Sequence, residues 1–254
     1  MMIRRGDEMI LYPDKEINHH VDESDLKYES IGTQMEKPMH QSIKYYLCPD
    51  SACHEFKIGR FIADIYQEGH IKEIQTGSFQ SLDHKLSALL PTYPITVVYP
   101  LVKRKTIIEM DYLYGTKKPK KSPKIGNPLH IMTELVKIKK HLLHPNLDFM
   151  IFYVDVDEYR RKSEASSSIK NHERLAQYPK GLPILYTLKT KDDFLTLLPD
   201  VLPEELTAKS LLKLLKLNKT ETQSLIQVYK TMGILQYIRK EGRAFVYQLN
   251  TKGE

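Results

Sequence analysis

The chain lacks tryptophan and has only two cysteines, Cys48 and Cys53, among its 254 residues. So few cysteines exclude a disulfide-rich secreted scaffold, and we expect both thiols to be free in a reducing compartment. No apolar run approaches the ~20 residues of a membrane-spanning helix. The first residues, MMIRRGDEMILYPDKE, also lack the continuous apolar segment of a secretory signal. We therefore expect a cytoplasmic protein with no membrane partner.

Neither sign of charge is in large excess, although basic residues lead. Lysine and arginine number 38 against 32 acidic residues, and this net charge of +6 suits a polyanionic partner such as DNA. A hydrophobic content of 41% is ordinary for a folded protein, and the length allows one large domain or two small ones.

Two short apolar segments separated by a polar turn, FIADIYQEGHIKEIQ from Phe61 to Gln75, predict a β-hairpin. In its second strand Glu73 and Gln75 stand two residues apart, so both point to the same face. When the hairpin closes, Asp64 lies on the neighbouring strand near Glu73. Two converging carboxylates suit Mg²⁺, which binds one or two carboxylates and keeps several waters. The alternative is an ordinary solvated face.

Helical and strand patterns flank this hairpin. Residues 35–47 have apolar residues at helical spacing, and within them Glu36 and His40 share one face. A second helix is expected from Ser78, a candidate N-cap. Three further segments predict strands: 54–58, 95–101 and 105–110. The predicted order is therefore helix, three strands, helix, strand, strand.

That order, with an acidic residue on the second strand and E-x-Q on the third, resembles the PD-(D/E)XK nuclease superfamily. The resemblance implies a restriction-endonuclease-like α/β fold, in which helices flank a mixed sheet. It implies that Asp64 and Glu73 ligate Mg²⁺ or Mn²⁺. It also implies a catalytic role for Glu36, which matches an acidic residue that many members carry on the first helix.

Two positions depart from the pattern of that superfamily. Gln75 occupies the place of the usual lysine, as in some restriction enzymes, and Ala63 stands where the family name has proline. Glutamine cannot supply the point charge of lysine, so stabilisation of a transition state would depend more on the metal.

The segment 115–126, GTKKPKKSPKIG, predicts an exposed basic loop. It is either a solvated linker or a surface that contacts the phosphates of DNA. The residues that would make these contacts are Lys117, Lys118, Lys120, Lys121 and Lys124. A helix over 129–143 and a strand over 147–156 are expected to complete the nuclease-like sheet.

A Ser-rich segment, 163–181, predicts a linker between domains. The sequence thus divides into four parts: an N-terminal lead-in (1–34), a nuclease-like domain (35–162), the linker (163–181) and a C-terminal domain (182–254).

The last part contains a helix capped by Thr207, a turn, a second helix that ends at Gly233, and two strands with a basic turn. This arrangement looks like a winged helix-turn-helix, which contacts either DNA or another protein. For DNA we expect contacts from the second helix and from the tip of the wing, namely Thr222, Gln223, Gln227, Lys230, Arg239, Lys240 and Arg243.

Three functional hypotheses follow from these features. The first is a metal-dependent DNA endonuclease whose substrate is positioned by the winged helix, acting as a homodimer or in a larger DNA-processing complex. The second is a non-catalytic DNA-binding or assembly factor on a degenerate nuclease core. The third is a transcriptional regulator whose N-terminal domain binds a partner protein.

Overall fold

The structure is a computed structural model that describes residues 17, 38–111, 115–116, 118–162 and 172–250. Glu36 and Lys117, which the sequence nominates as catalytic and DNA-binding residues, lie outside these ranges. So does the predicted lead-in, except for Ile17, whose backbone pairs with that of Gly181.

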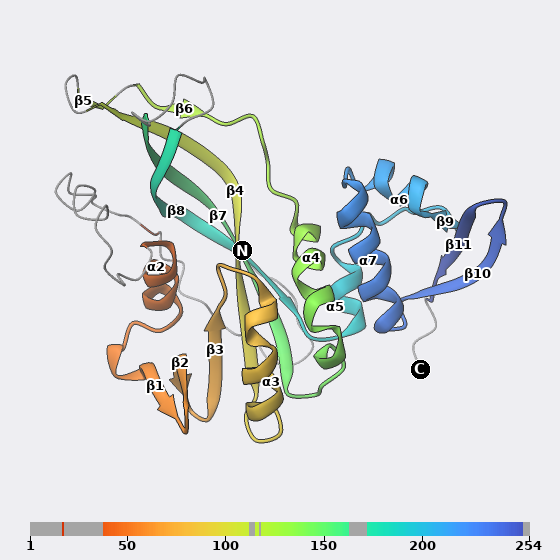
Figure 1. Ribbon diagram of the computed structural model, residues 1–254, viewed down its shortest axis with the longest axis horizontal. Helices are drawn as coiled ribbons and strands as arrows, with labels where there is room; N and C mark the ends of the chain where they lie inside the picture. Colours follow the sequence, from red (N-terminus) through yellow and green to blue (C-terminus); the bar gives the residue numbers. More distant parts are fainter. Residues whose placement is uncertain (1–16, 18–37, 112–114, 117, 163–171, 251–254) are drawn as a thin grey trace.

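A large mixed β-sheet forms the body of the molecule (Figure 1). Its main path is β1-β2-β3-β4-β7-β8, in which β3, β4 and β7 run parallel and the other neighbours antiparallel. The strands on this path are β1 (His54–Ile58), β2 (Phe61–Gln67), β3 (His70–Ile74), β4 (Ile95–Asp111), β7 (Leu147–Lys162) and β8 (His172–Leu188). Two short strands, β5 (Gly115–Thr116) and β6 (Lys120–Lys121), pair with β4. The predicted α/β class with a mixed sheet is confirmed.

Helices cover both faces of this sheet because successive side chains of the central strands are buried on opposite sides. Val97 and Ile151 belong to one apolar core, whereas Val98 and Phe152 belong to the other. Helix α2 (Pro38–Leu47) contributes Ile43 to the second core. The first core is covered by η2 (Phe79–Leu82), α3 (Asp83–Leu89), η3 (Pro128–Ile131), α4 (Met132–Leu135) and η4 (Val136–His141).

Two predicted elements differ in the structure. The strands expected at 95–101 and 105–110 form one strand, β4, because β7 pairs along almost all of its length. The single helix expected over 129–143 is divided into η3, α4 and η4, with non-helical backbone at Ile138. Its apolar positions nevertheless remain buried, so the periodicity identified the packed face and not the helix type.

Strands β4, β7 and β8 are far longer than their neighbours and extend beyond the helices as an arm (Figure 1). The arm contains a buried carboxylate, Glu158, which accepts hydrogen bonds from Lys105 (2.8 Å), Arg160 (2.5 Å) and Gln177 (2.6 Å). Burial alone would raise the pKa of Glu158, but these partners outweigh it and lower that pKa. The Glu158 carboxylate of β7 therefore links the three strands of the arm through hydrogen bonds with side chains of β4, β7 and β8.

The prediction of a linker over 163–181 is wrong for its second half. Residues from His172 onward form β8, which pairs with β7 over most of its length. The Ser-rich composition concealed a strand whose inward positions, such as Ala176 and Pro179, are buried. The large sheet consequently continues past residue 182, where the C-terminal domain was expected to begin.

In the C-terminal unit two successive helices, α6 and α7, precede a hairpin, in the predicted order. Its elements are α5 (Lys191–Leu195), β9 (Leu206–Thr207), α6 (Ala208–Leu214), α7 (Lys219–Thr231), β10 (Leu235–Glu241) and β11 (Ala244–Leu249), with strand order β10-β11-β9. Thr207 and Asn218 form capping boxes at α6 and α7. Gly233, with φ of +69°, turns the chain after α7, where a glycine is favoured.

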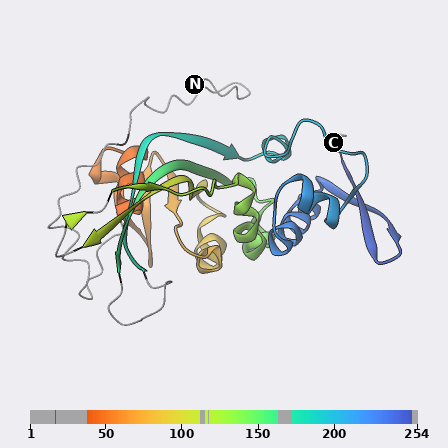
Figure 2. The ribbon, with the colours of Figure 1, turned by 90° about the horizontal axis from the view of Figure 1, so that it is seen from above.

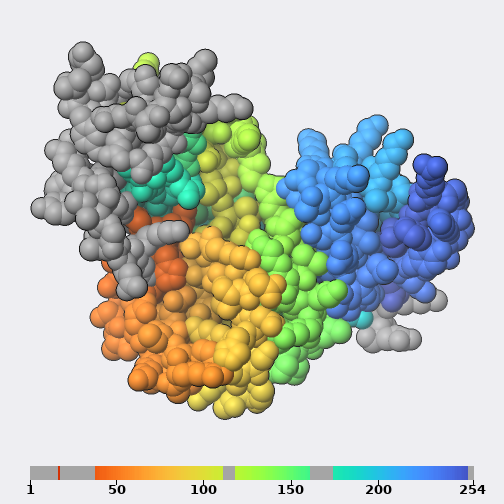
Figure 3. All heavy atoms as spheres, in the orientation of Figure 1, coloured from red at the N-terminus to blue at the C-terminus, as the bar shows by residue number. Residues whose placement is uncertain are grey.

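This unit and the large sheet share one apolar core. Helix α7 packs against α4 (Figures 2 and 3), and Leu135 of α4 and Leu225 of α7 belong to the same buried cluster. The amide of Asn127 donates to the carbonyl of Leu215 (3.0 Å), and the hydroxyl of Tyr229 donates to that of Phe194 (2.8 Å). The two parts are therefore held as one packed body.

Within the described residues, no helix is both long and apolar enough to span a membrane. Cys48 is buried and Cys53 partly exposed, and they are not joined in a disulfide.

We predict that the described body unfolds in a single cooperative transition. Leu225→Ala should lower the unfolding free energy by about 2–5 kcal/mol, because it removes buried methyl groups from the shared core. Scanning calorimetry should show the whole transition moving to lower temperature, while Gln223→Ala, at an exposed position of the same helix, should leave it in place. Two transitions, of which Leu225→Ala moves one, would contradict the shared core.

Candidate functional site

Asp64 lies where β2 and β3 separate. Backbone pairing between these strands includes Gln67↔His70, Tyr66↔Ile71 and Ile65↔Lys72, and one step further the Asp64 carboxylate accepts from the backbone N–H of Ile74 (2.7 Å). The same oxygen, Oδ2, lies 3.2 Å from Nε2 of His40 on α2. Burial would raise the pKa of Asp64, but His40, the Ile74 amide and the charge of Lys85 together lower it. Asp64 is thus an ionised carboxylate.

Glu73 is the second carboxylate of the site and is almost fully buried, with 7% of its side chain exposed. Burial, followed by the negative charge of Asp64, raises the pKa of Glu73 to about 7, against the lowering effect of Lys85. Its Oε1 lies 2.6 Å from Nζ of Lys85, so the buried carboxylate is ion-paired with that ammonium.

Lys85 brings a cation to this pair of carboxylates, and the sequence pattern did not nominate it. It belongs to α3, and its Nζ also donates to the carbonyl of Ile62 on β2 (2.5 Å). Spacing could not reveal this contact because the orientation of α3 across the sheet decides it. One signal was available: Lys85 is the only lysine between Gln75 and Pro100.

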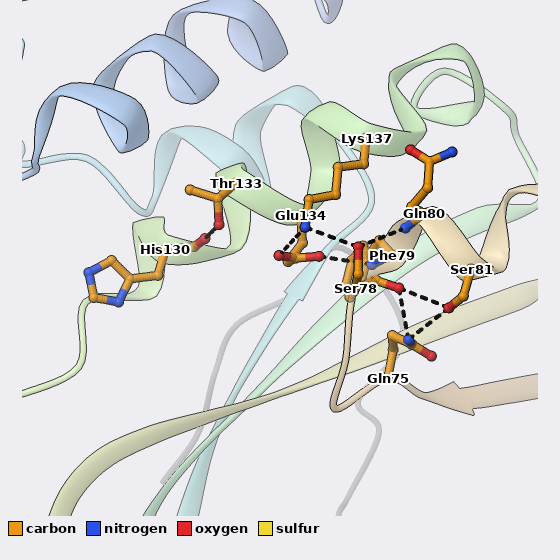
Figure 4. A network of polar contacts seen from close by, with 9 residues as sticks. All are labelled: Gln75, Ser78, Phe79, Gln80, Ser81, His130, Thr133, Glu134 and Lys137. Carbon is orange, nitrogen blue, oxygen red and sulfur yellow. Dashed lines mark hydrogen bonds and ion pairs between the residues drawn. The ribbon is translucent and has the colours of Figure 1, made fainter.

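Gln75, predicted to stand in for the family lysine, directs its amide to the following turn (Figure 4). Its Nε2 donates to the carbonyl of Ser78 (3.0 Å) and to Oγ of Ser81 (3.1 Å). The structure thus gives Gln75 a structural contact, and the cation near Glu73 is Lys85.

Glu134 of α4 and Lys137 of η4 hold the same turn from the opposite side (Figure 4). The Glu134 carboxylate accepts from the backbone N–H of Phe79 (2.8 Å). Lys137 donates both to Glu134 (2.6 Å) and to Oγ of Ser78 (3.1 Å). Because α4 also packs against α7, the turn beside the two carboxylates is connected to the C-terminal unit through one short helix.

The two carboxylates fit a small hard cation. Carboxylate oxygens are the ligands that Mg²⁺ prefers, and one or two of them suffice when water fills the remaining positions. Oε1 of Glu73 is buried and already lies beside one cation, the Lys85 ammonium at 2.6 Å, so this position suits a positive charge. No group of three or more His, Cys, Asp or Glu side chains there could hold a metal, so a cation at Asp64 and Glu73 would depend on water.

A protein-family model, the Domain of unknown function (DUF8091), matches residues 37–182, which is more than half of the chain. The chain belongs to the DUF8091 family. An uncharacterized protein of Treponema pallidum (strain Nichols) is 31% identical over 126 residues, which cover 49% of this chain and 50% of that protein. The chain thus spans about half the length of this relative. No solved structure matches it.

The DUF8091 region contains Asp64, Glu73 and Lys85 and ends within β8. The family match therefore includes the candidate site and most of the large sheet, whereas the C-terminal unit lies beyond it. The match ends inside β8, which continues to Leu188, and next to the predicted end of the linker at residue 181.

Lysines of the predicted basic loop lie along the arm of the DUF8091 region. Four of them, Lys118, Lys120, Lys121 and Lys124, are exposed. The loop is more ordered than predicted because β6 pairs with β4 and Gly126 is held closely. A Cβ at Gly126 would lie 2.1 Å from the carbonyl oxygen of Val102, and the Gly126 carbonyl accepts from the Tyr153 hydroxyl (2.7 Å).

The predicted DNA-contacting residues of the C-terminal unit are only partly available. Gln223, Gln227, Lys230, Lys240 and Arg243 are exposed.

Two others of this set are engaged within the protein. The prediction that Thr222 faces outward is wrong: it is 1% exposed, and its hydroxyl donates to the Asn218 carbonyl (2.8 Å), because the buried face of α7 is wider than its apolar stripe. Arg239 is paired with both carboxylate oxygens of Glu205 (2.5 and 2.7 Å) and with Glu241.

We predict an unusual pH dependence from Glu73. Its folded-state pKa is about 7 against an ordinary value of 4.5, so between these values the folded state holds a proton that the unfolded chain has lost. The unfolding free energy contributed by this group therefore falls as the pH rises from 4.5 to 7. In EDTA, Glu73→Gln should gain stability relative to the wild type by on the order of 2–3 kcal/mol between pH 5 and pH 8, measured by urea unfolding.

Asp64→Asn is the companion variant. The folded-state pKa of Asp64 is lowered, so its own stabilising contribution is complete above the ordinary value of 3.8 and is lost only in more acidic solution. Between pH 5 and pH 8 this variant should show a smaller gain than Glu73→Gln, because removing the Asp64 charge takes away only the second of the two causes that raise the pKa of Glu73. A constant difference for Glu73→Gln across this range would mean that Glu73 is ionised throughout.

Proposed function

We propose that this DUF8091 protein is a metal-dependent DNA endonuclease with an E-x-Q variant of the PD-(D/E)XK site. The observation that carries the proposal is the meeting of Asp64 and Glu73 on adjacent strands with Lys85 at 2.6 Å from Glu73. Two carboxylates and a cation are the groups that phosphodiester hydrolysis needs: ligands for Mg²⁺ or Mn²⁺ and a positive charge for the phosphate.

Asp64 and Glu73 would hold the cation, which when bound lowers the pKa of a water ligand and neutralises phosphate charge. Asp64 is suited to this because the Ile74 amide and His40 keep it ionised and fixed. The raised pKa of Glu73 makes metal binding expel a proton near neutral pH, so affinity should increase with pH. In the reaction, the water oxygen would bond to phosphorus and lose its proton to solvent, the P–O ester bond would break, and the leaving oxygen would take up a proton from solvent to become a hydroxyl.

Lys85 would supply the charge that Gln75 cannot. In the absence of metal the Lys85 ammonium neutralises Glu73. The Lys85 side chain is 15% exposed and lies at the edge of the carboxylate pair. With the Glu73 carboxylate holding a metal ion, the Lys85 ammonium would be free to contact a phosphate oxygen. Gln75 then acts through the turn 76–81, which it helps to hold.

The C-terminal unit supports a second part of the proposal, a winged helix-turn-helix that positions DNA. Helices α6 and α7 precede the hairpin β10–β11 in the order of that motif. One side of α7 is packed against α4, and its opposite side exposes Gln223, Gln227 and Lys230. These amides and this ammonium can reach base edges or phosphates.

A non-catalytic DNA-binding factor is the second candidate, and one observation favours it. Glu73 already has an internal cation, Lys85, and its raised pKa leaves it partly protonated at neutral pH. A core that no longer binds metal would be stabilised in this way. Metal binding separates the two candidates.

We predict that purified protein nicks or linearises supercoiled plasmid in Mg²⁺ or Mn²⁺. Asp64→Ala and Glu73→Ala should abolish cleavage, and Lys85→Ala should slow it by roughly 100-fold or more, because it removes a charge aimed at the phosphate. Lys57→Ala, an exposed lysine on neighbouring β1, is the matched control and should cleave normally. Circular dichroism checks that each variant is folded.

Calorimetry with Mn²⁺ provides a readout that does not depend on finding the right substrate. The wild type should bind the ion more tightly at pH 8 than at pH 6, and Asp64→Ala should not bind it. If the wild type binds no metal and cuts no duplex, branched or single-stranded DNA, the nuclease proposal is wrong and the non-catalytic candidate replaces it.

For the basic arm we predict a purely electrostatic contribution. Replacing Lys120, Lys121 and Lys124 by alanine should weaken binding of a 20-base-pair duplex in EDTA and should reduce the slope of log affinity against log salt by roughly 2–3. Three other exposed lysines, Lys57, Lys189 and Lys209, form the control triple variant and should leave the slope unchanged. Equal slopes for both triple variants would exclude the arm from the interface.

A further inference from the structure

The hairpin β10–β11 carries exposed aromatic side chains that the proposed function does not use. Tyr237 in β10 is 45% exposed and Phe245 in β11 is 50% exposed. Their ring centroids are 5.8 Å apart, in an edge-to-face arrangement. Tyr247, on the same face two residues after Phe245, lies 6.4 Å from Tyr237 and is 7% exposed. We call Tyr237, Phe245 and Tyr247 the aromatic stripe; it runs from the core toward the tip of the hairpin.

Positive charge lies at the outer end of the aromatic stripe. Lys240 is the cross-strand partner of Phe245, and its Nζ lies 5.8 Å from the Phe245 ring centroid. Arg243 is exposed in the turn between the strands. Arg239 contributes rigidity instead, because Glu205 and Glu241 hold its guanidinium. The exposed cations are therefore placed beyond the rings and beside them.

Two half-exposed aromatic rings on adjacent strands leave apolar surface in contact with water, which is unfavourable unless a partner covers it. Exposed apolar patches of this kind mark interaction sites, and aromatic rings on strands with nearby cations are the general means of holding unpaired bases. A ring face accepts any base by stacking, and a neighbouring ammonium or guanidinium contacts the phosphate that follows it. A regular duplex keeps its bases stacked on one another, so its bases cannot use these rings.

We propose that the aromatic stripe, with Lys240 and Arg243, is a stacking site for unpaired bases of single-stranded nucleic acid. The inference rests on the proposed function only in taking nucleic acid as the partner. It requires neither metal nor cleavage. It assigns to the hairpin a role different from that of α7: the helix faces a duplex, and the hairpin holds a strand that has separated from it.

The test is binding of a fluorescently labelled 20-nucleotide oligothymidine, followed by anisotropy in EDTA so that no strand is cut. Tyr237→Ala and Phe245→Ala should each weaken binding by roughly 5- to 100-fold, the effect of losing one stacked base. Tyr237→Leu and Phe245→Leu should lose as much, because leucine keeps an apolar surface without a ring. Tyr237→Phe and Phe245→Tyr should bind like the wild type.

Ile238→Ala is the matched control, because Ile238 is 40% exposed in the same strand and has no ring. It should leave oligothymidine binding unchanged. A 20-base-pair duplex should lose little affinity in any of the ring variants. Oligothymidine carrying 5-iododeoxyuridine should form photo-crosslinks that map to Tyr237 or Phe245.

The proposal is overturned if the leucine variants bind oligothymidine as the wild type does, since the patch would then be merely apolar and suited to a protein partner. It is also overturned if duplex and single-strand binding fall together. A wild type that binds oligothymidine through Tyr237 and Phe245 but neither binds Mn²⁺ nor cuts any DNA would refute the nuclease and leave the stacking site standing. If the leucine variants cleave plasmid and bind oligothymidine as the wild type does, the stacking site is refuted and the nuclease stands.

Discussion

The hydrogen bond from the Ile74 amide to the Asp64 carboxylate is the contact on which the rest of the candidate site depends. It forms where β2 and β3 part, so a side chain replaces the next backbone acceptor of the sheet. This fixes Asp64 beside Glu73 and leaves a second carboxylate buried next to the first. Burial, followed by the like charge of Asp64, raises the pKa of Glu73, and the Lys85 ammonium beside Glu73 compensates in part.

Helix α4 has a second integrating role, because it touches both ends of the proposed machinery. Glu134 of α4, with Lys137 of the adjoining η4, holds the turn after Gln75, while Leu135 of α4 lies in the core that α7 shares. A partner of the C-terminal unit would therefore bind a unit that is already packed against the sheet. The domain division predicted from composition separated the large sheet from the C-terminal unit, but the shared apolar core joins them.

Some charged side chains form ion pairs within the protein, whereas others are exposed to solvent. Glu158 forms ion pairs with Lys105 and Arg160 inside the arm, and Arg239 is paired with Glu205. The exposed basic residues include those of the arm, the outer side of α7 and the hairpin tip. Net charge alone could not distinguish these groups, because an ion-paired arginine and a free lysine count equally in it.

By itself the sequence determined the local features. Alternation placed the hairpin 61–75, capping residues marked α6 and α7, and the two-residue spacing set Glu73 and Gln75 on one side of a strand. Tertiary structure decided the contacts between elements: Lys85 instead of Gln75 beside Glu73, the burial of Thr222, the continuation of the sheet through β8, and the shared core. The reason is physical. Periodicity reports which way a side chain leaves its own backbone, whereas the neighbour that it meets depends on how helices and strands pack across the sheet.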